Sequence, residues 1–472
     1  MVAGANNDTY YFSSDGGFTW GEGTLTTPYG VWGDPVVIVD TNGSFYFLHL
    51  SLVNWNQWLD RIVCQKSTDG GMTWDDGAYM GLNSPKQQDK EWAVVDRTNN
   101  NIYSSWTQFD NYGSTLPSDS SVILFSRSTD AGATWSGAIR INVKAGDCED
   151  MDNTVEGAVP AVGPDGEIFI SWAGPLGLVF TKSTDGGLTW PSTNKIICDM
   201  PGGWDFGIPG IFRANGLPVT CCDLSNGPYR GTIYINWSDQ RNGSDDTDIW
   251  IVKSTDGGET WSSPKRVNND PAGRQQFFTW MTIDPVTGFL YTVFYDRREH
   301  TGVLTDVYMA VSRDGGETFD NFKVSESPFT PNSSIFFGDY TNISAVNNIV
   351  RPIWTRLDNG SLSIITAIVD SLYVGISPEK QGSVPFSLEQ NFPNPARNYT
   401  YFSYKIHQQT RVTLKVFDLY GKEVACLREG ESMVPGKYVE KLDTKSNGLT
   451  PGFYYFSLVS GEQSVKRKMI VE

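Results

Sequence analysis

The sequence is poor in several of the features on which common catalytic and membrane-spanning folds depend. No stretch of its 472 residues shows convincing helical periodicity, and no apolar run is long enough to cross a membrane. Only three histidines are present, His49, His300 and His407, and they do not cluster. Phosphate-binding loops and Gly-x-Ser-x-Gly elbows are also missing. These absences argue against histidine-based catalysis, against a catalytic metal centre held by histidines, and against nucleotide binding.

Positive charge and metal-spaced cysteines are scarce as well. The chain has 36 Lys and Arg against 54 Asp and Glu, a formal net charge of −18. Nucleic acids and anionic membrane surfaces are therefore poor partners. The six cysteines show no zinc-ligand spacing. Cys148 and Cys198 flank one repeat and could pair outside the cytosol, although spacing alone does not establish connectivity.

What the chain does contain is one eight-residue motif written six times. The shortest and longest intervals, from Trp20 to Trp74 and from Trp190 to Trp261, are 54 and 71 residues. A motif that recurs at such a period indicates a repeat architecture. The copies are Ser13–Trp20, Ser67–Trp74, Ser128–Trp135, Ser183–Trp190, Ser254–Trp261 and Ser312–Phe319.

Each copy reads as a structural turn. Its Asp can accept hydrogen bonds from backbone amides that follow it, and its second Gly supplies the positive φ of a tight reversal. The closing aromatic residue is then expected to point back into an apolar layer. Calcium binding by the motif is disfavoured, because one recurring carboxylate is too few for a site of six to eight oxygen ligands.

β-Branched and aromatic runs surround each motif and predict an all-β fold. One such run precedes most copies, two more stand before it, and a short one can follow. Each repeat therefore predicts four antiparallel strands, which is one blade of a β-propeller. The inner strands are expected near residues 35–41, 91–97, 156–163, 206–213, 277–284 and 337–346. Six blades, closed by the N-terminal strands, is the favoured prediction; seven, with one strand missing, is the alternative.

The motif Ser-x-Asp-x-Gly-x-Thr-Trp resembles the Asp-box, or BNR repeat, of sialidase-like propellers, and the resemblance covers residues 1–370. It implies the propeller fold. It is weaker as a sign of activity, because Asp-boxes also occur in propellers that are not sialidases.

The pattern changes after residue 370. Residues 371–385 read as a linker, and residues 386–472 contain alternating strands that predict a small immunoglobulin-like β-sandwich. Four motifs in this segment resemble the C-terminal sorting domain of the type IX (Por) secretion system of Bacteroidetes-type bacteria. They are residues 390–395, 416–421, 451–455 and 466–471. The resemblance implies the type IX machinery as a partner, with release from the cell or attachment to the outer-membrane surface. A plain accessory module is the alternative.

The expected functional face lies opposite the Asp-box turns, where loops surround the central channel. Acids stand at the starts of the predicted inner strands, and aromatic and arginine residues follow the second strands. Aromatic rings offer flat faces to sugars, and arginines bind carboxylates bidentately. The candidate substrate-binding residues are Arg241, Arg298, Arg356, Trp237, Tyr295, Trp354 and Asp339.

The resemblance to sialidases implies an exo-glycosidase with three arginines on the substrate carboxylate, a Tyr–Glu nucleophile pair and an Asp acid. Tyr340 or Tyr295 would be the nucleophile, with Glu156 or Glu91 beside it. Asp34 or Asp89 would be the acid. No cofactor is expected, although the carboxylates could hold a structural calcium ion.

The sequence departs from the sialidase pattern in one respect. The early Arg-Ile-Pro motif is absent, and the nearest match, Phe212-Arg213-Ala, comes too late in the chain. One alternative is a rim braced by pairing of Asp239 or Asp296 with a following arginine. The other is a non-catalytic surface propeller that binds glycans or proteins.

Overall fold

The computed structural model describes residues 1–370, 386–418, 422–461 and 463–471. The chain divides into two compact units, Met1–Gly375 and Ile376–Glu472. The expected linker, residues 371–385, lies outside the described residues. Among the residues described, the only helix is the short 3-10 helix η1 (Trp55–Gln57), and none is long and apolar enough to cross a membrane.

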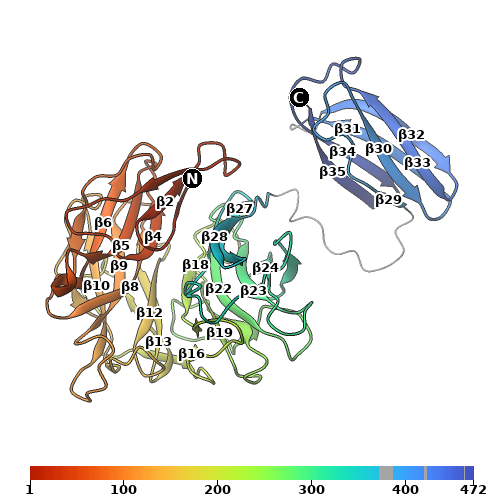
Figure 1. Ribbon diagram of the computed structural model, residues 1–472. Helices are drawn as coiled ribbons and strands as arrows, with labels where there is room; N and C mark the ends of the chain where they lie inside the picture. The colour runs from red at the N-terminus through yellow and green to blue at the C-terminus, as the bar shows by residue number, and fades with distance from the viewer. Residues whose placement is uncertain (371–385, 419–421, 462, 472) are drawn as a thin grey trace. The chain divides into compact units, whose positions relative to one another are not determined.

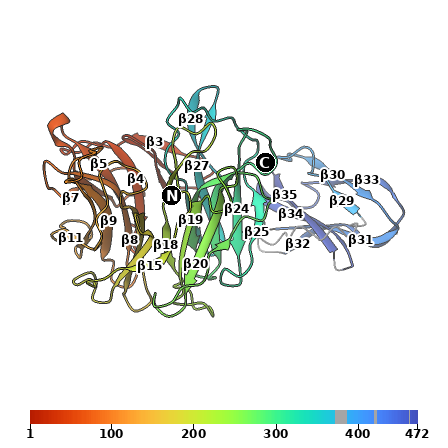
Figure 2. The ribbon, with the colours of Figure 1, turned by 90° about the horizontal axis from the view of Figure 1, so that it is seen from below.

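Antiparallel sheets follow one another in chain order through the first unit (Figures 1 and 2). Five of them have four strands, with sequential strands as neighbours. They are β4 (Gly33–Val39), β5 (Phe45–Leu52), β6 (Trp58–Ser67) and β7 (Ala78–Met80); β8 (Gln87–Val95), β9 (Ile102–Phe109), β10 (Ser121–Ser128) and β11 (Ile139–Arg140); β12 (Glu156–Val162), β13 (Ile168–Gly174), β14 (Gly177–Ser183) and β15 (Lys195–Cys198); β18 (Val219–Cys222), β19 (Ile233–Asp239), β20 (Asp248–Ser254) and β21 (Lys265–Arg266); and β22 (Gln276–Ile283), β23 (Leu290–Asp296), β24 (Asp306–Ser312) and β25 (Asp320–Lys323).

Two sheets at the ends of this unit have three strands, and one hairpin stands apart. The first sheet contains β1 (Val2–Gly4), β2 (Thr9–Phe12) and β3 (Gly21–Thr24). The last contains β26 (Asn342–Val346), β27 (Ile349–Asp358) and β28 (Ser361–Thr366). The hairpin joins β16 (Asp205–Phe206) to β17 (Ala214–Asn215). The N-terminal strands thus pair with one another and do not complete the sheet of β26 to β28.

The sheets close into a ring around their first strands. β4, β8, β12, β18, β22 and β26 contact one another in that order, and β1 contacts β4. The two ends meet where Arg351 of β27 donates a hydrogen bond from Nε to the Gly16 carbonyl oxygen, at 3.0 Å. This radial arrangement of antiparallel sheets is that of a β-propeller.

The expected position of the fourth inner strand, residues 206–213, is wrong. The innermost strand of that sheet is β18, and residues 207–213 instead form the loop of the β16–β17 hairpin. Gly207, Pro209 and Gly210 interrupt this segment, and Gly210 has a φ of +81°. Glycine and proline favour a turn over a central strand, so the apolar residues between them were misleading.

The Asp-box turns fasten each sheet to the one before it. In the copy at Ser183–Trp190, Ser183 accepts a hydrogen bond from the Gly187 amide and donates one to Asp185. Asp185 also accepts from the amide and hydroxyl of Thr189. Trp190 is half-buried and packs edge-on against Phe125 of the preceding sheet, with ring centroids 4.9 Å apart. The turn geometry and the inward aromatic residue agree with the sequence prediction.

The second unit is built of two sheets that share one core. One sheet has the order β29 (Phe386–Leu388), β30 (Tyr399–Ile406), β33 (Gly436–Asp443). The other has the order β32 (Glu423–Met433), β31 (Thr410–Phe417), β34 (Gly452–Ser460), β35 (Gln463–Val471). Phe402 of β30 and Phe456 of β34 meet with ring centroids 4.4 Å apart. The four expected strands are present; β29, β32 and β33 were not anticipated.

Candidate functional site

A repeated irregularity in the inner strands reshapes the channel end opposite the Asp-boxes. The pairing shifts register between Gly33 and Val36 in β4, and a shift at the corresponding place occurs in β8, β12 and β22. Inside these bulges, Asp34 and Lys90 have φ values of +53°, and Phe278 has +50°. A non-glycine residue in the left-handed region is strained, and a bulge re-aims its side chain. The bulges thereby bring Asp34 and Lys90 into one group of charges.

Lys90 is the centre of this group. Its Nζ lies 3.1 Å from Asp34 Oδ2, 3.3 Å from Asp339 Oδ2 and 3.9 Å from Asp89 Oδ1. Burial lowers the pKa of Lys90, but the charges of Asp34, Asp89 and Asp339 outweigh burial and raise it well above its usual value. Lys90 is therefore a fixed positive charge that holds three carboxylates together.

Arg213 is the second cation. It donates two hydrogen bonds to Asp339, from Nε at 2.7 Å and from Nη2 at 2.5 Å, and its Nη1 lies 3.4 Å from Asp150. Tyr112 donates a hydrogen bond to the same Asp150 oxygen, at 2.5 Å. Despite burial, its two cationic partners hold the pKa of Asp339 below its ordinary value.

Two further acids are enclosed beside these pairs. Glu91 and Glu156 are each 1% exposed. Both carboxylate oxygens of Glu91 and Oε1 of Glu156 have no hydrogen-bond partner among the described residues. Burial raises the pKa of both groups well above the usual range, with neighbouring acids adding to the effect. Burial also raises the pKa of Asp89, to about 7, although Lys90 opposes the shift.

We name this group the axial cluster. It places six carboxyl groups around two cations, and it includes three of the four predicted catalytic carboxyl or phenol residues, with Tyr340 beside it. Its members are Asp34, Asp89, Lys90, Glu91, Asp150, Glu156, Arg213 and Asp339.

Tyr340 lies where the axial cluster meets a groove. Its ring packs edge-on against Trp92, with centroids 4.9 Å apart. Burial raises the pKa of Tyr340 well above its usual value, and the charge of Asp34 raises it further. A phenolate nucleophile needs the opposite shift, so the environment of Tyr340 does not favour that role.

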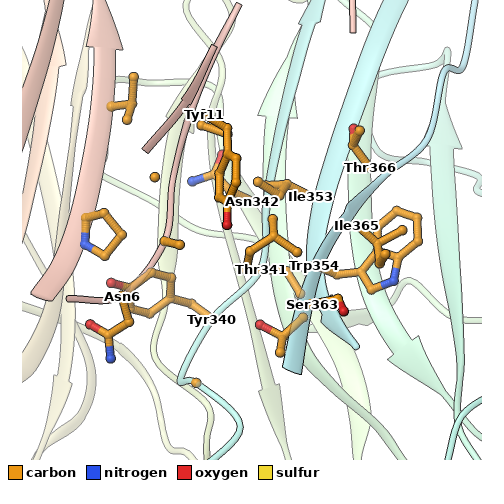
Figure 3. Close-up of a pocket in the computed structure, with 18 of the residues that line it drawn as sticks. Asn6, Tyr11, Tyr340, Thr341, Asn342, Ile353, Trp354, Ser363, Ile365 and Thr366 are labelled. Carbon is orange, nitrogen blue, oxygen red and sulfur yellow. The ribbon is translucent and has the colours of Figure 1, made fainter. Parts of the chain in front are cut away.

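The groove, of about 580 Å³, runs between the sheet of β1 to β3 and the sheet of β26 to β28. Asp34, Asp339 and Tyr340 lie along its lining. Figure 3 shows Asn6 and Tyr11 of the N-terminal strands facing Tyr340, Thr341 and Asn342. The predicted Trp354 also lines this groove, with 4% of its surface exposed.

The three predicted arginines are each engaged by a neighbouring acid. Arg241 donates to Asp239 from Nε, at 2.9 Å, and Arg298 donates to Asp296, at 2.8 Å. Arg356 donates to Asp358, at 2.5 Å. The bracing that was the alternative explanation for Asp239 and Asp296 is thus present. Sequence-based support for a set of arginines around one substrate carboxylate is lost.

Two of the predicted sugar-binding aromatic residues belong to the core instead. Trp237 is 0% exposed and donates a hydrogen bond to Asp239, at 2.8 Å. Tyr295 is 1% exposed, and its hydroxyl donates to the Thr355 carbonyl oxygen, at 2.8 Å. This differs from the expectation that the rings face a ligand. Strand alternation places them inward, which the positions at strand ends did not reveal.

Sequence reasoning missed Lys90, Asp150 and Tyr112, and it set Arg213 aside. Lys90 stands between two acids in Asp89-Lys90-Glu91, a run that a solvated strand surface would also produce. Arg213 was rejected because it does not match a sialidase motif. A short Phe-Arg segment in a glycine-rich loop was the available signal for it.

The described residues also bring together Glu299, His300 and Asp306 as a potential metal-binding group. Lys323 Nζ lies 2.7 Å from Glu299 and 3.6 Å from Asp306. His300 Nε2 lies 2.8 Å from Asp306. The lysine already supplies a positive charge there, so the geometry does not favour a calcium ion.

Three solved structures with a similar fold are glycan-processing proteins. A Hadza microbial sialidase has 16% identity and a TM-score of 0.42; the match covers 71% of this chain and 65% of that one. An intramolecular trans-sialidase from Ruminococcus gnavus has 12% identity and a TM-score of 0.47, with 75% and 97% covered. The alpha-L-arabinofuranosidase Arb93A from Fusarium graminearum has 12% identity and a TM-score of 0.46, with 78% and 98% covered.

No curated protein matches the sequence. The second unit is matched more specifically than the propeller. Residues 390–472 match the family described as the secretion system C-terminal sorting domain, so this part of the chain is a sorting domain of the Por type.

Proposed function

We propose that the protein is a secreted propeller that engages an extracellular glycan at the axial cluster. The sorting domain at residues 390–472 supports export by the type IX system, which is typical of Bacteroidetes. The axial cluster supports a ligand site at the channel end opposite the Asp-box turns. It is reached from the groove lined by Asp34, Asp339 and Tyr340.

The charge of the axial cluster favours a neutral glycan over a sialoside. Lys90 and Arg213 are both bound to carboxylates, and the acids outnumber them. With Glu91 and Glu156 protonated, the remaining acids still exceed the two cations. A substrate carboxylate would meet like charge and find no free guanidinium.

The observation that carries a catalytic role is the contrast between neighbouring carboxyl groups. Glu156 holds its proton, because burial raises its pKa, whereas Asp339 is held ionised by Lys90 and Arg213. Glycoside hydrolysis needs one carboxylic acid that donates a proton and one carboxylate. We assign the acid to Glu156 and the carboxylate to Asp339 within a glycoside hydrolase.

The test is release of reducing ends from a panel of neutral polysaccharides, with a fluorogenic sialoside as a further substrate. Turnover of a neutral substrate that is lost in Glu156→Gln supports the proposal. Glu149→Gln is the matched control, because Glu149 is exposed in the same segment of chain. Sialoside turnover with no activity on neutral glycans would contradict the assigned substrate class.

A non-catalytic glycan-binding propeller is the second candidate, and one observation favours it. Glu156 is only 1% exposed, and Asp339 is already saturated by two cations. A binding site needs no access to a buried acid. Glycan binding without turnover, unchanged in Glu156→Gln, would select this candidate.

We also propose that the propeller has seven blades and that the sorting domain is immunoglobulin-like. The blade count is supported by the separate pairing of β1 to β3 and of β26 to β28. The sandwich class is supported by the two sheets that share the Phe402–Phe456 contact. An experimental structure in which the two three-stranded sheets merge into one would contradict the seven-blade count.

A further inference from the structure

A run of aromatic rings leads from solvent to the axial cluster. It begins at Trp55 in η1, between β5 and β6, whose surface is 74% exposed. Trp55 packs edge-on against Trp32, with ring centroids 5.6 Å apart, and Trp32 packs against Trp58 at 6.2 Å. A tryptophan this exposed contributes little to the core, so its position needs another explanation.

The inner end of the run touches the candidate site. Trp58 packs edge-on against Tyr112, with centroids 5.7 Å apart. Tyr112 donates its hydroxyl hydrogen bond to Asp150, which in turn lies 3.4 Å from Arg213. The rings therefore form a continuous path to a member of the axial cluster.

All four rings lie at the ligand end of the propeller. Trp32 precedes β4, Trp55 lies between β5 and β6, Trp58 begins β6, and Tyr112 lies between β9 and β10. These positions are at the end where the inner strands begin, opposite the Asp-box turns. The Nε1 atom of Trp58 is buried and has no hydrogen-bond partner among the described residues, which leaves one donor unused.

Carbohydrate is the ligand class that fits such a run. The C–H faces of sugar rings stack on flat aromatic surfaces, whereas their hydroxyl groups need polar partners nearby. Asn54 and Gln57, both beside Trp55 in sequence, supply amides, with Asn54 Nδ2 donating to Gln57 Oε1 at 2.6 Å. The four rings carry no charge, which matches a neutral chain.

We propose that Trp55, Trp32, Trp58 and Tyr112, the aromatic strip, form stacking subsites for successive units of a neutral oligosaccharide that extends from the axial cluster. This inference rests on the proposed function and deepens it, because it makes the ligand an oligomer and not a single sugar. Trp55 forms the subsite farthest from the axial cluster. Its contribution is therefore made only to chains long enough to reach it.

The experiment measures affinity against chain length by calorimetry. The probes are cello-, xylo-, manno- and arabino-oligosaccharides of about two to six units, titrated into the full chain. The affinity of the wild-type protein is expected to rise with length, and Trp55→Ala is expected to weaken the longest chain by about 5- to 10-fold. The same variant leaves the shortest chain unchanged, and Trp55→Phe retains most of the gain.

The control is Leu188→Ala, which removes an apolar side chain 58% exposed at the opposite, Asp-box end. It is expected to change no affinity. Length-dependent binding that is identical in Trp55→Ala would overturn the aromatic strip while leaving the proposed function intact. Failure of every oligosaccharide to bind or react would overturn both. If Trp55→Ala instead abolishes self-association in sedimentation and leaves glycan affinity unchanged, the strip is an interface between copies and the proposal fails.

Discussion

Arg213 and Asp339, which are 126 positions apart in sequence, form a two-point hydrogen-bonded ion pair across the channel. Asp339 precedes the last sheet of the propeller, and Arg213 precedes β17 in the hairpin between β15 and β18. Lys90 of β8 reaches the same carboxylate, at 3.3 Å. One acid therefore ties together three parts of the ring that the chain reaches far apart.

Replacing Arg213 with alanine is expected to destabilise the propeller. The side chain of Asp339 is 4% exposed, so it would lose its main partner while staying buried. Breaking a buried pair leaves an uncompensated charge, and here Lys90 compensates in part, so we expect a loss of about 2–3 kcal/mol. Urea denaturation measures it. Arg274→Ala, which removes a rim arginine whose only guanidinium hydrogen bond is to the Gly273 carbonyl oxygen, is the control and should change stability by less than about 0.5 kcal/mol.

The fold was largely predictable because its signals are local. The Asp-box motif contains the serine, aspartate, glycine and threonine that bond to one another within eight residues, as Ser183, Asp185, Gly187 and Thr189 do. The strands before it follow from β-branched and aromatic composition. Failure came at the fourth inner strand, where apolar residues in a glycine-interrupted loop imitated a strand.

The site was less predictable because its geometry depends on strand bulges. Lys90 faces the carboxylates only because its φ is +53°, a value that no property of a lysine suggests. The predicted acids Asp34, Asp89 and Asp339 do meet around it. The predicted arginines failed to support a triad because a local acid, two residues away in each case, satisfies them first.

The pH dependence of stability should report the buried acids. Glu91 and Glu156 have folded-state pKa values raised well above those of an exposed glutamate, mainly by burial. The folded protein therefore binds more protons than the unfolded chain above about pH 4, and stability falls as pH rises through this window. Glutamine resembles the protonated acid, so the stability of Glu156→Gln relative to the wild type should increase from pH 5 to pH 8.

Urea denaturation at several pH values gives this difference. Glu149→Gln serves again as the exposed control, and its difference from the wild type should not vary with pH. A Glu156→Gln difference that is constant between pH 5 and pH 8 would show that Glu156 is ionised in the folded protein. That result would also remove the proton donor from the proposed mechanism.

The contact between Trp190 and Phe125 should carry part of the cohesion between neighbouring sheets. Trp190→Ala removes a half-buried ring that packs on the preceding sheet, with centroids 4.9 Å apart. We expect the propeller to lose about 2–3 kcal/mol, less than for a fully buried tryptophan. Thermal unfolding followed by tryptophan fluorescence and calorimetry measures the change. Leu188→Ala, in the same turn but 58% exposed, should leave the midpoint unchanged.

The sorting domain should be needed for export and not for folding of the propeller. Residues 390–472 match the sorting family, and the propeller has a core of its own in a separate compact unit. Removal of residues 386–472 is therefore expected to leave a folded propeller that stays inside a Bacteroidetes host, whereas the full chain reaches the surface or the medium. Immunoblots of cell fractions measure the distribution, and circular dichroism of the purified truncated protein checks its fold. A truncated protein that is folded and still exported would contradict the role of the domain, because the signal would then reside in residues 1–385.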